Sequence, residues 1–185
     1  MKTKSLLLML FLCLSVATSC KRTTEKPLKR NEIQAQMINT RAPAFSLKDT
    51  EGKTVSLEDL KGKVVVVDFW ATWCPYCMKS LPGMQKAVTK YKDNPDVKFL
   101  FINTRETGAK RLDLIKKLME KNNYSFHVLL DERDIAANAY EVEGLPTKFV
   151  IDKIGIIRFK TVGFSGSTDN LVDELSTMID LASKQ

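Results

Sequence analysis

The chain has 185 residues, of which 44% are apolar and 28% are charged, which suits one ordinary globular domain with a short extension. The formal net charge of +7 is modest and comes from basic residues spread along the chain. Because no basic run is interleaved with aromatic residues, nucleic-acid binding is not expected, and the charge is interpreted as a solvated surface.

The first residues have the pattern of an export signal. Lys2 and Lys4 form a basic start, residues 6–14 are an apolar run too short to cross a bilayer, and residues 15–19 are mostly small. We therefore expect residues 1–19 to be a signal peptide. Cys20 follows directly in a context that resembles a lipobox, in which the cysteine is lipidated and becomes the new N-terminus. Ala17 stands where the commonest form has Leu, so cleavage without lipidation is the alternative.

A polar stretch follows the signal. Residues 20–41 are charged and without clear periodicity, so we interpret them as a lipid-anchored tether between the membrane and a folded domain. Cys13 would leave with the signal, and Cys20 would be capped by lipid. Only Cys74 and Cys77 would then remain as thiols, so no other cysteine of the chain could form a wrong disulfide with this pair.

From residue 42 onward, short apolar runs alternate with helical patterns. The four valines at 64–67 are typical of a buried strand, and periodic apolar residues favour amphipathic helices at 107–121 and 168–183, the second capped by Ser167 or Thr168. We expect strands at 45–47, 54–56, 63–69, 97–102, 126–130, 148–151 and 156–162, a helical turn at 57–60, and helices at 75–91, 107–121, 134–140 and 168–183. This alternation implies a parallel core with right-handed crossovers and a closing antiparallel hairpin.

Cys74 and Cys77 stand at the junction between the central strand and the helix that follows it. At a helix N-terminus the free backbone N–H groups and the positive end of the dipole stabilise a thiolate, which would make Cys74 a nucleophile. Cys77 falls one turn later on the same face, within reach for a disulfide with Cys74 or for attack on a mixed disulfide formed there. The spacing therefore predicts a pair that exchanges two electrons with another dithiol.

Other interpretations of the Cys-x-x-Cys pair are weaker. A zinc site lacks its second half, because the remaining cysteines are Cys13 and Cys20 and the one histidine is His127. Haem attachment needs His directly after the second cysteine, where Met78 stands. An inert structural disulfide is the other alternative, but it would close so short a loop that it would remove little entropy from the unfolded chain. A redox role is preferred.

The residues around the pair resemble the thioredoxin superfamily. Residues 67–77, Val-Asp-Phe-Trp-Ala-Thr-Trp-Cys-Pro-Tyr-Cys, are similar to its active-site segment, and residues 144–147, Gly-Leu-Pro-Thr, are similar to its cis-proline loop. Pro82 matches the proline that kinks the active-site helix. The resemblance covers residues 42–185. It implies an α/β thioredoxin-like fold, with a central mixed sheet, helices on both faces, an N-terminal β-hairpin extension and an inserted helix-strand segment.

Within the superfamily, the chain is most similar to exported, membrane-anchored thiol:disulfide oxidoreductases of the TlpA/ResA type. Three features carry this similarity: the opening at residues 42–47, the Gly52-Lys53 hairpin before residues 57–60, and the extra segment between Asn103 and Leu130. One position departs from the ResA-like pattern. In that pattern an acid lies three residues after the second cysteine, where Ser80 stands here.

The resemblance assigns roles to further residues. Asp68 matches the buried acid of thioredoxins, and a carboxyl group in apolar surroundings has a raised pKa, so it would take the proton of Cys77 during attack on the mixed disulfide. An edge-facing carboxylate is the alternative for Asp68. Pro146 would have a cis peptide bond and leave the backbone of Leu145 free to bind an extended client chain beside Cys74. Without the family, this stretch predicts only a turn.

Client contacts are expected around Cys74, from Trp73, Pro75 and Tyr76 together with the cis-proline loop. Trp70 fits an apolar collar or plain core equally well. The dipeptide Pro75-Tyr76 resembles that of glutaredoxin, and residues between the cysteines tune the reduction potential. His127 is interpreted as structural. No metal site is expected, and no cofactor beyond the redox-active Cys74–Cys77 disulfide.

Together these features predict an exported thiol:disulfide oxidoreductase on the periplasmic or cell-surface side. Cys74 would attack a client disulfide, Cys77 would resolve the mixed disulfide, and a membrane thiol donor would recycle the protein. The resemblance suggests reduction of client cysteines, for instance those of apocytochromes before haem attachment.

Three alternatives remain open: a disulfide-inserting oxidase, a thiol-dependent peroxidase and a Cu(I) carrier that uses two thiolates, with a methionine or His127 as a candidate further ligand. A peroxiredoxin would need Pro and Thr before its reactive cysteine, which residues 71–73, Ala-Thr-Trp, do not supply. The related copper-assembly proteins have three residues between the cysteines, whereas Pro75 and Tyr76 are the only two here.

Overall fold

The computed structural model describes residues 26–34 and 36–185, and this part of the chain forms a sheet of eight strands flanked by helices. The strands are β1 (Thr40–Arg41), β2 (Ser46–Asp49), β3 (Thr54–Ser56), β4 (Val64–Trp70), β5 (Val97–Asn103), β6 (Val128–Leu130), β7 (Thr147–Ile151) and β8 (Ile156–Val162). Their spatial order is β1-β8-β7-β4-β5-β6-β2-β3. The predicted signal peptide, Cys20 and the first part of the predicted tether lie outside the described residues.

The centre of the sheet is parallel and its outer parts are antiparallel. β4 runs parallel to β5, and β5 runs parallel to β6. β7 is antiparallel to β4, with Asp68 opposite Lys148 and Phe69 opposite Thr147. β8 forms a hairpin with β7, and the β2–β3 hairpin joins the other side of the sheet through β6. The predicted mixed sheet with an N-terminal hairpin extension is confirmed.

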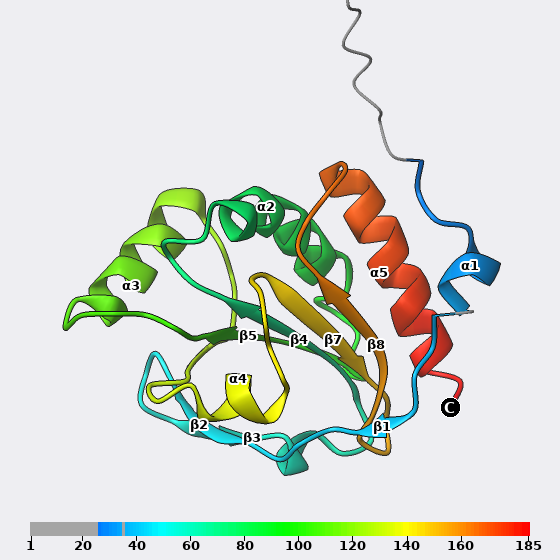
Figure 1. Ribbon diagram of the computed structural model, residues 1–185, viewed down its shortest axis with the longest axis horizontal. Coiled ribbons are helices and arrows are strands. Elements are labelled where there is room, and N and C mark those ends of the chain that lie inside the picture. The colour runs from blue at the N-terminus through cyan, green and yellow to red at the C-terminus, as the bar shows by residue number, and fades with distance from the viewer. Residues whose placement is uncertain (1–25, 35) are drawn as a thin grey trace, which may run out of the picture.

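Helices cover both faces of the sheet (Figure 1). On one face lie α2 (Pro75–Lys90), α3 (Arg111–Asn122) and α5 (Thr168–Ala182); on the other lie α4 (Ile135–Ala139) and the 3₁₀ turn η1 (Glu58–Leu60). A short helix, α1 (Arg30–Gln34), packs on the outer side of α5. No helix within the described residues is both long and apolar enough to cross a bilayer.

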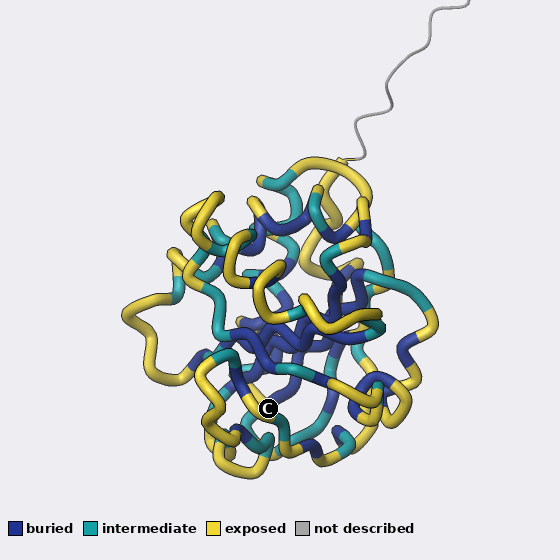
Figure 2. The backbone as a smooth tube through the Cα atoms, turned by 90° about the vertical axis from the view of Figure 1, so that its left-hand side faces the viewer, coloured by how far each residue is buried: buried dark blue, intermediate teal, exposed yellow. Residues whose placement is uncertain are grey.

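The sheet separates two apolar layers, and the buried backbone is concentrated in the middle of the molecule (Figure 2). Alternate residues of β4 point to opposite faces, so Val66 and Trp70 pack toward α2 and α5 whereas Val67 and Phe69 pack toward α4. All seven residues of β4 are buried, as expected for a central strand that is covered on both faces. The same alternation places Asp68 on the α2/α5 side.

The predicted elements from residue 45 onward are confirmed, with boundaries that differ by a few residues. Pro82 lies inside α2, and Ser167 is the N-cap of α5, where its Oγ accepts the N–H of Asn170 at 3.1 Å. The hairpin of β7 and β8 closes through the predicted turn at residues 152–155, in which Gly155 has a φ of 84°.

The structure corrects the interpretation of residues 26–41 as tether. This segment contains α1 and β1, and Ile33 is fully buried in the α2/α5 layer. Arg30 pairs with Asp180 at 3.4 Å, and the N–H of Ile38 donates to the carbonyl of Arg158 at 2.8 Å. One buried isoleucine in a single helical turn leaves no repeating apolar pattern, which is why periodicity did not reveal it.

The helix predicted at 107–121 also differs, since α3 begins only at Arg111. Gly108, with a φ of 102°, has a backbone conformation that an α-helix does not allow. Of the predicted apolar face, Ile115 is fully buried, whereas Leu112 is 36% exposed.

Candidate active site

Cys74 and Cys77 lie at the start of α2, after the short turn that follows β4, and they form a disulfide with Cα atoms 5.2 Å apart. Cys74 is the N-cap of the helix, and its Sγ accepts the N–H of Cys77 at 3.1 Å. Pro75 occupies the first helical position, where a missing N–H leaves no hydrogen bond unmade. Cys74 is 3% exposed and Cys77 is fully buried, so the outer sulfur belongs to Cys74. In the reduced protein, the positive end of the helix would favour a thiolate at this outer position.

Asp68 is buried on the face of the sheet that also carries the cysteine pair. Its side chain is 1% exposed, and its cross-strand neighbour on β7 is Lys148, with Nζ 3.9 Å from Oδ1. Burial raises the pKa of Asp68 to about 6, and the positive charge of Lys148 opposes this rise. A carboxyl group with this pKa is able to accept and release a proton close to neutral pH.

The hydrogen bonding of Asp68 differs from that of the other buried carboxylates. Asp131 accepts the N–H groups of Ala136 and Ala137, and Asp152 accepts backbone N–H groups and pairs with Arg158 at 2.7 Å. Neither carboxylate oxygen of Asp68 has a hydrogen-bond partner within the described part of the chain. Buried polar groups in native proteins are normally satisfied, so an unsatisfied carboxyl group with a raised pKa marks a candidate functional residue.

The Leu145-Pro146 peptide bond is cis, as the resemblance implies. The pairing of Phe69 with Thr147 places this bond beside the segment that follows β4, which is the segment leading to the cysteines. The carbonyl of Pro146 accepts the N–H of Gly163 at 2.7 Å, whereas the main chain of Leu145 makes no hydrogen bond to any described residue. Leu145 thus has main-chain groups without hydrogen-bond partners among the described residues, in the loop beside the segment that leads to the cysteines.

The two aromatic residues nearest Cys74 in sequence are exposed. Trp73 and Tyr76 are each 57% exposed, and Pro75 between them is exposed as well. The indole N–H of Trp73 donates to the carbonyl of Arg105 at 2.9 Å, which holds the ring in place. Trp70 is fully buried, so it is a core residue and does not form part of an exposed collar.

Two further positions discussed from the sequence have structural surroundings. Ser80 is buried, and its hydroxyl donates to the carbonyl of Cys77 at 2.9 Å. His127 lies 3.2 Å from Asp49, in a hollow shared with Tyr91 just beyond the end of α2. Cys74 lies at the other end of this 16-residue helix, about 24 Å away by helical rise, so the structure does not bring His127 to the cysteines. Among the described residues no group of three or more His, Cys, Asp or Glu side chains could hold a metal ion.

Sequence reasoning missed a cluster formed by the loop after β5. Glu106 accepts hydrogen bonds from Thr72, in the turn before Cys74, and from Asn103 at the end of β5. Arg111 in turn donates to the side chain of Asn103 at 2.7 Å. Because β4 and β5 are adjacent and parallel, their C-terminal ends meet at one edge of the sheet, and polar residues directly after β5 are therefore candidates for contact with the cysteine loop.

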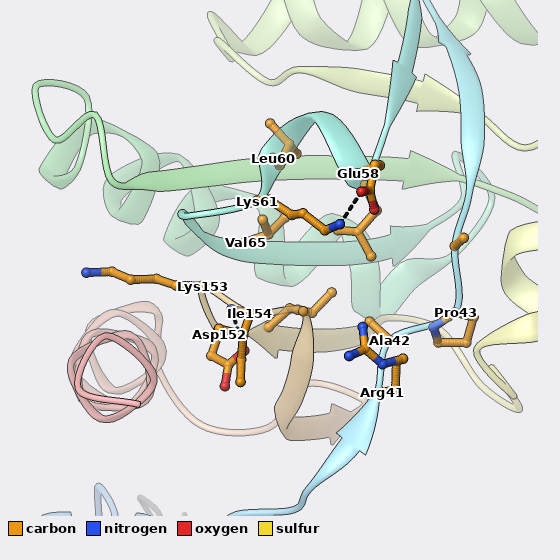
Figure 3. Close-up of a pocket in the computed structure, with 14 residues that line it drawn as sticks. Arg41, Ala42, Pro43, Glu58, Leu60, Lys61, Val65, Asp152, Lys153 and Ile154 are labelled. Carbon is orange, nitrogen blue, oxygen red and sulfur yellow. Dashed lines mark hydrogen bonds and ion pairs between the residues drawn. The ribbon is translucent and has the colours of Figure 1, made fainter.

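A cavity of about 400 Å³ lies at the other end of the sheet from the disulfide (Figure 3). Val65 at the start of β4 lines it together with Leu60 and Ile154, whereas the cysteines follow the end of β4. Glu58 and Lys61 on its rim pair with each other. Asp152 in its lining pairs with Arg158 at 2.7 Å, and Arg41 is exposed.

The fold and the capped disulfide define a thioredoxin-like thiol-disulfide oxidoreductase. The chain is 35% identical over 130 residues to thiol-disulfide oxidoreductase ResA of Bacillus cereus, which covers 70% of this chain and 72% of that protein. It also resembles the structure of a thiol:disulfide interchange protein of Chlorobium tepidum, with a TM-score of 0.63, 29% identity, and coverage of 78% of this chain and 97% of the other. A second interchange protein, from Bacteroides sp., gives a TM-score of 0.64 at 28% identity, with coverage of 77% and 90%. The AhpC/TSA family model matches residues 38–160, and the chain belongs to this thioredoxin-like family.

Proposed function

We propose that the protein reduces disulfide bonds of client proteins outside the cytoplasm, while anchored to a membrane through a lipid on Cys20. The observation that carries the reaction is the pairing of an outer sulfur on Cys74 with a fully buried inner sulfur on Cys77, on the same side of the sheet as the unsatisfied carboxyl group of Asp68. This arrangement separates the sulfur that a client reaches from the sulfur that resolves the intermediate.

The reaction proceeds in two exchanges. The Cys74 thiolate attacks one sulfur of the client disulfide, which forms a mixed disulfide and releases one client thiolate. Cys77 then loses its proton to Asp68 and attacks Sγ of Cys74, which forms the disulfide seen in the structure and releases the second client thiolate. Two electrons pass from the protein to the client, and the client thiolates take up two protons from solvent and from Asp68.

The client is held as an extended segment along the cis-proline loop. The free main-chain groups of Leu145 pair with the client backbone, while Trp73, Pro75 and Tyr76 contact its side chains. Because backbone pairing reads no sequence, this mode suits a reductase that acts on several clients. Apocytochromes before haem attachment are one such client class, in keeping with the ResA-like relatives.

A membrane thiol donor returns the oxidised pair to the dithiol state. A membrane location for the domain is supported by the signal-like residues 1–19 and the lipobox-like context of Cys20. With lipidation, the protein and its thiol donor are held at the same membrane surface, where the donor reduces the Cys74–Cys77 disulfide after each reaction with a client.

The reduction potential of the Cys74–Cys77 couple tests the direction of electron flow. The purified protein is equilibrated with dithiothreitol or glutathione buffers, and the fraction of disulfide is measured after acid quenching. A potential near that of thioredoxin, about −270 mV, supports a reductase, whereas a value of about −120 mV would show an oxidant that inserts disulfides. Labelling of Cys20 with a radioactive fatty acid in cells, compared with Cys20→Ser, tests the anchor separately.

A further inference from the structure

The loop between β5 and α3 is tied to the turn that carries Cys74, although the two segments are more than thirty residues apart. The carboxylate of Glu106 accepts the backbone N–H of Thr72 at 2.5 Å and the hydroxyl of Thr72 at 3.1 Å. The next residue, Trp73, donates its indole N–H to the carbonyl of Arg105 at 2.9 Å. Both residues that directly precede Cys74 are therefore held by one loop.

Further hydrogen bonds fix this loop to the ends of β4 and β5 and to Asp134. Asn103 donates to Glu106 at 3.0 Å and to the carbonyl of Trp70 at 3.4 Å, which links the ends of β5 and β4. Arg105 has a φ of 54°, and its N–H donates to Asp134 at 2.7 Å. Glu106 is half-buried and is the shared acceptor of the hydrogen bonds from Thr72 and Asn103, so its side chain is held in one position.

We propose that Glu106 is a positioning residue for the cysteine pair, which orients the turn before Cys74 and whose negative charge disfavours the Cys74 thiolate and so keeps the couple reducing. The inference rests on the reductase function proposed above. It assigns to the β5–α3 loop a part in setting the reduction potential, in addition to the residues between the two cysteines.

The direction of the charge effect follows from electrostatics. Thr72 is two residues from Cys74, so their Cα atoms are at most roughly 8 Å apart, two steps of about 3.8 Å, and the carboxylate of Glu106 is bonded to Thr72. A negative charge at this distance opposes a second negative charge on sulfur. Arg111 places an opposite charge near this carboxylate and reduces the effect; burial lowers the pKa of Arg111, and the charge of Glu106 partly opposes that lowering. In a partly hydrated site, the remaining effect is about threefold in the thiolate equilibrium.

The test separates charge from position with two substitutions at one residue. Glu106→Gln removes the charge, yet its amide oxygen can still accept from Thr72 and Asn103 and its amide N–H can donate to the Thr72 hydroxyl. Glu106→Ala removes both charge and hydrogen bonds. Glu120→Gln, at an exposed position on the last turn of α3, is the matched control for net charge.

Three readouts are compared in the purified proteins: the reduction potential, the thiolate fraction of Cys74 from its ultraviolet absorbance at about pH 7, and the rate of reduction of a disulfide-linked peptide. We expect Glu106→Gln to raise the thiolate equilibrium about threefold and the potential by about 14 mV, the same factor for a two-electron couple. We expect Glu106→Ala to share this shift and also to slow peptide reduction at least about tenfold relative to Glu106→Gln, since the hydrogen bonds to Thr72 and Asn103 are lost.

A potential for Glu106→Gln that moves no further than that of Glu120→Gln would overturn the charge effect. Equal rates for Glu106→Gln and Glu106→Ala would overturn the positioning role. The proposed direction of electron flow fails on a different result, an oxidising potential of the unaltered protein, and the difference between the variants is measurable in either case.

Discussion

Asp68→Asn is expected to stabilise the oxidised protein at neutral pH. The pKa of Asp68 is raised by burial from 3.8 to about 6, so the folded protein binds a proton more tightly than the unfolded chain does. The stability that this proton binding supplies is fully present below about pH 4 and is lost as the pH rises to about 6. This rise in pKa means that the ionised carboxylate lowers the free energy of unfolding at pH 7 by about 3 kcal/mol. Asparagine removes this cost, although Lys148 then loses its partner, so we expect a net gain of about 1–3 kcal/mol.

Urea unfolding of both proteins, followed by tryptophan fluorescence between about pH 4 and about pH 8, measures this effect. The difference in free energy of unfolding, variant minus wild type, should rise through the window from about pH 4 to about 6 and then remain level. Asp93→Asn, at a carboxylate that is 88% exposed, should give a difference near zero throughout. A difference for Asp68→Asn that is the same at both ends of the pH range would refute a raised pKa for this buried group.

Three further substitutions test other parts of the structure. Cys77→Ser should trap a client in a mixed disulfide on Cys74, visible as a band on a non-reducing gel that dithiothreitol removes, and the double replacement of both cysteines should give no such band. Ile33→Ala should lower the free energy of unfolding by about 2–5 kcal/mol, since it leaves a cavity at a fully buried site. The control Ile38→Ala, at a residue that is 39% exposed, should lower it far less. Equal effects of the two substitutions would contradict the packing of α1 against the domain. Gly83→Ala should destabilise by about 1–3 kcal/mol, because its Cβ would lie 3.2 Å from the carbonyl oxygen of Thr168 on α5 as well as 2.8 Å from the side chain of Leu171. An unchanged melting temperature would show that α5 moves freely.

The central fold was predictable because its signals are local. The four valines of β4 and the apolar spacing of α5 each lie within one short window, and the cysteine pair falls where the pattern changes from strand to helix. The parallel core followed from the alternation of elements, which leaves few possible topologies. Burial of Asp68 was predictable for the same reason, since its neighbours on both sides in the strand are apolar.

The parts that were missed depend on contacts between distant segments. Ile33 is buried only because α5, more than a hundred residues later, provides the surface against which it packs. Glu106 follows a strand in a polar loop, and nothing in its own neighbourhood indicates that its partner is Thr72. Trp70 fitted core and collar equally from the sequence, and strand alternation decides for the core because Trp70 shares a face with Val66.

Two carboxyl groups belong to or contact the segment that leads to the cysteines, and their surroundings differ: Asp68 lies inside β4 and Glu106 is bonded to Thr72. Asp68 has no hydrogen bond from the described residues, and burial raises its pKa to about 6, so it can change charge during the reaction. Glu106 is partly exposed and accepts three hydrogen bonds, from the N–H and hydroxyl of Thr72 and from Asn103. Ser80 donates to the backbone at the position where the ResA-like pattern has an acid, so the proposed proton transfer falls to Asp68, on the side of the sheet that faces α2. In the two proposals made above, Asp68 serves the resolving step and Glu106 serves the reduction potential, so these two properties would be adjusted by separate residues.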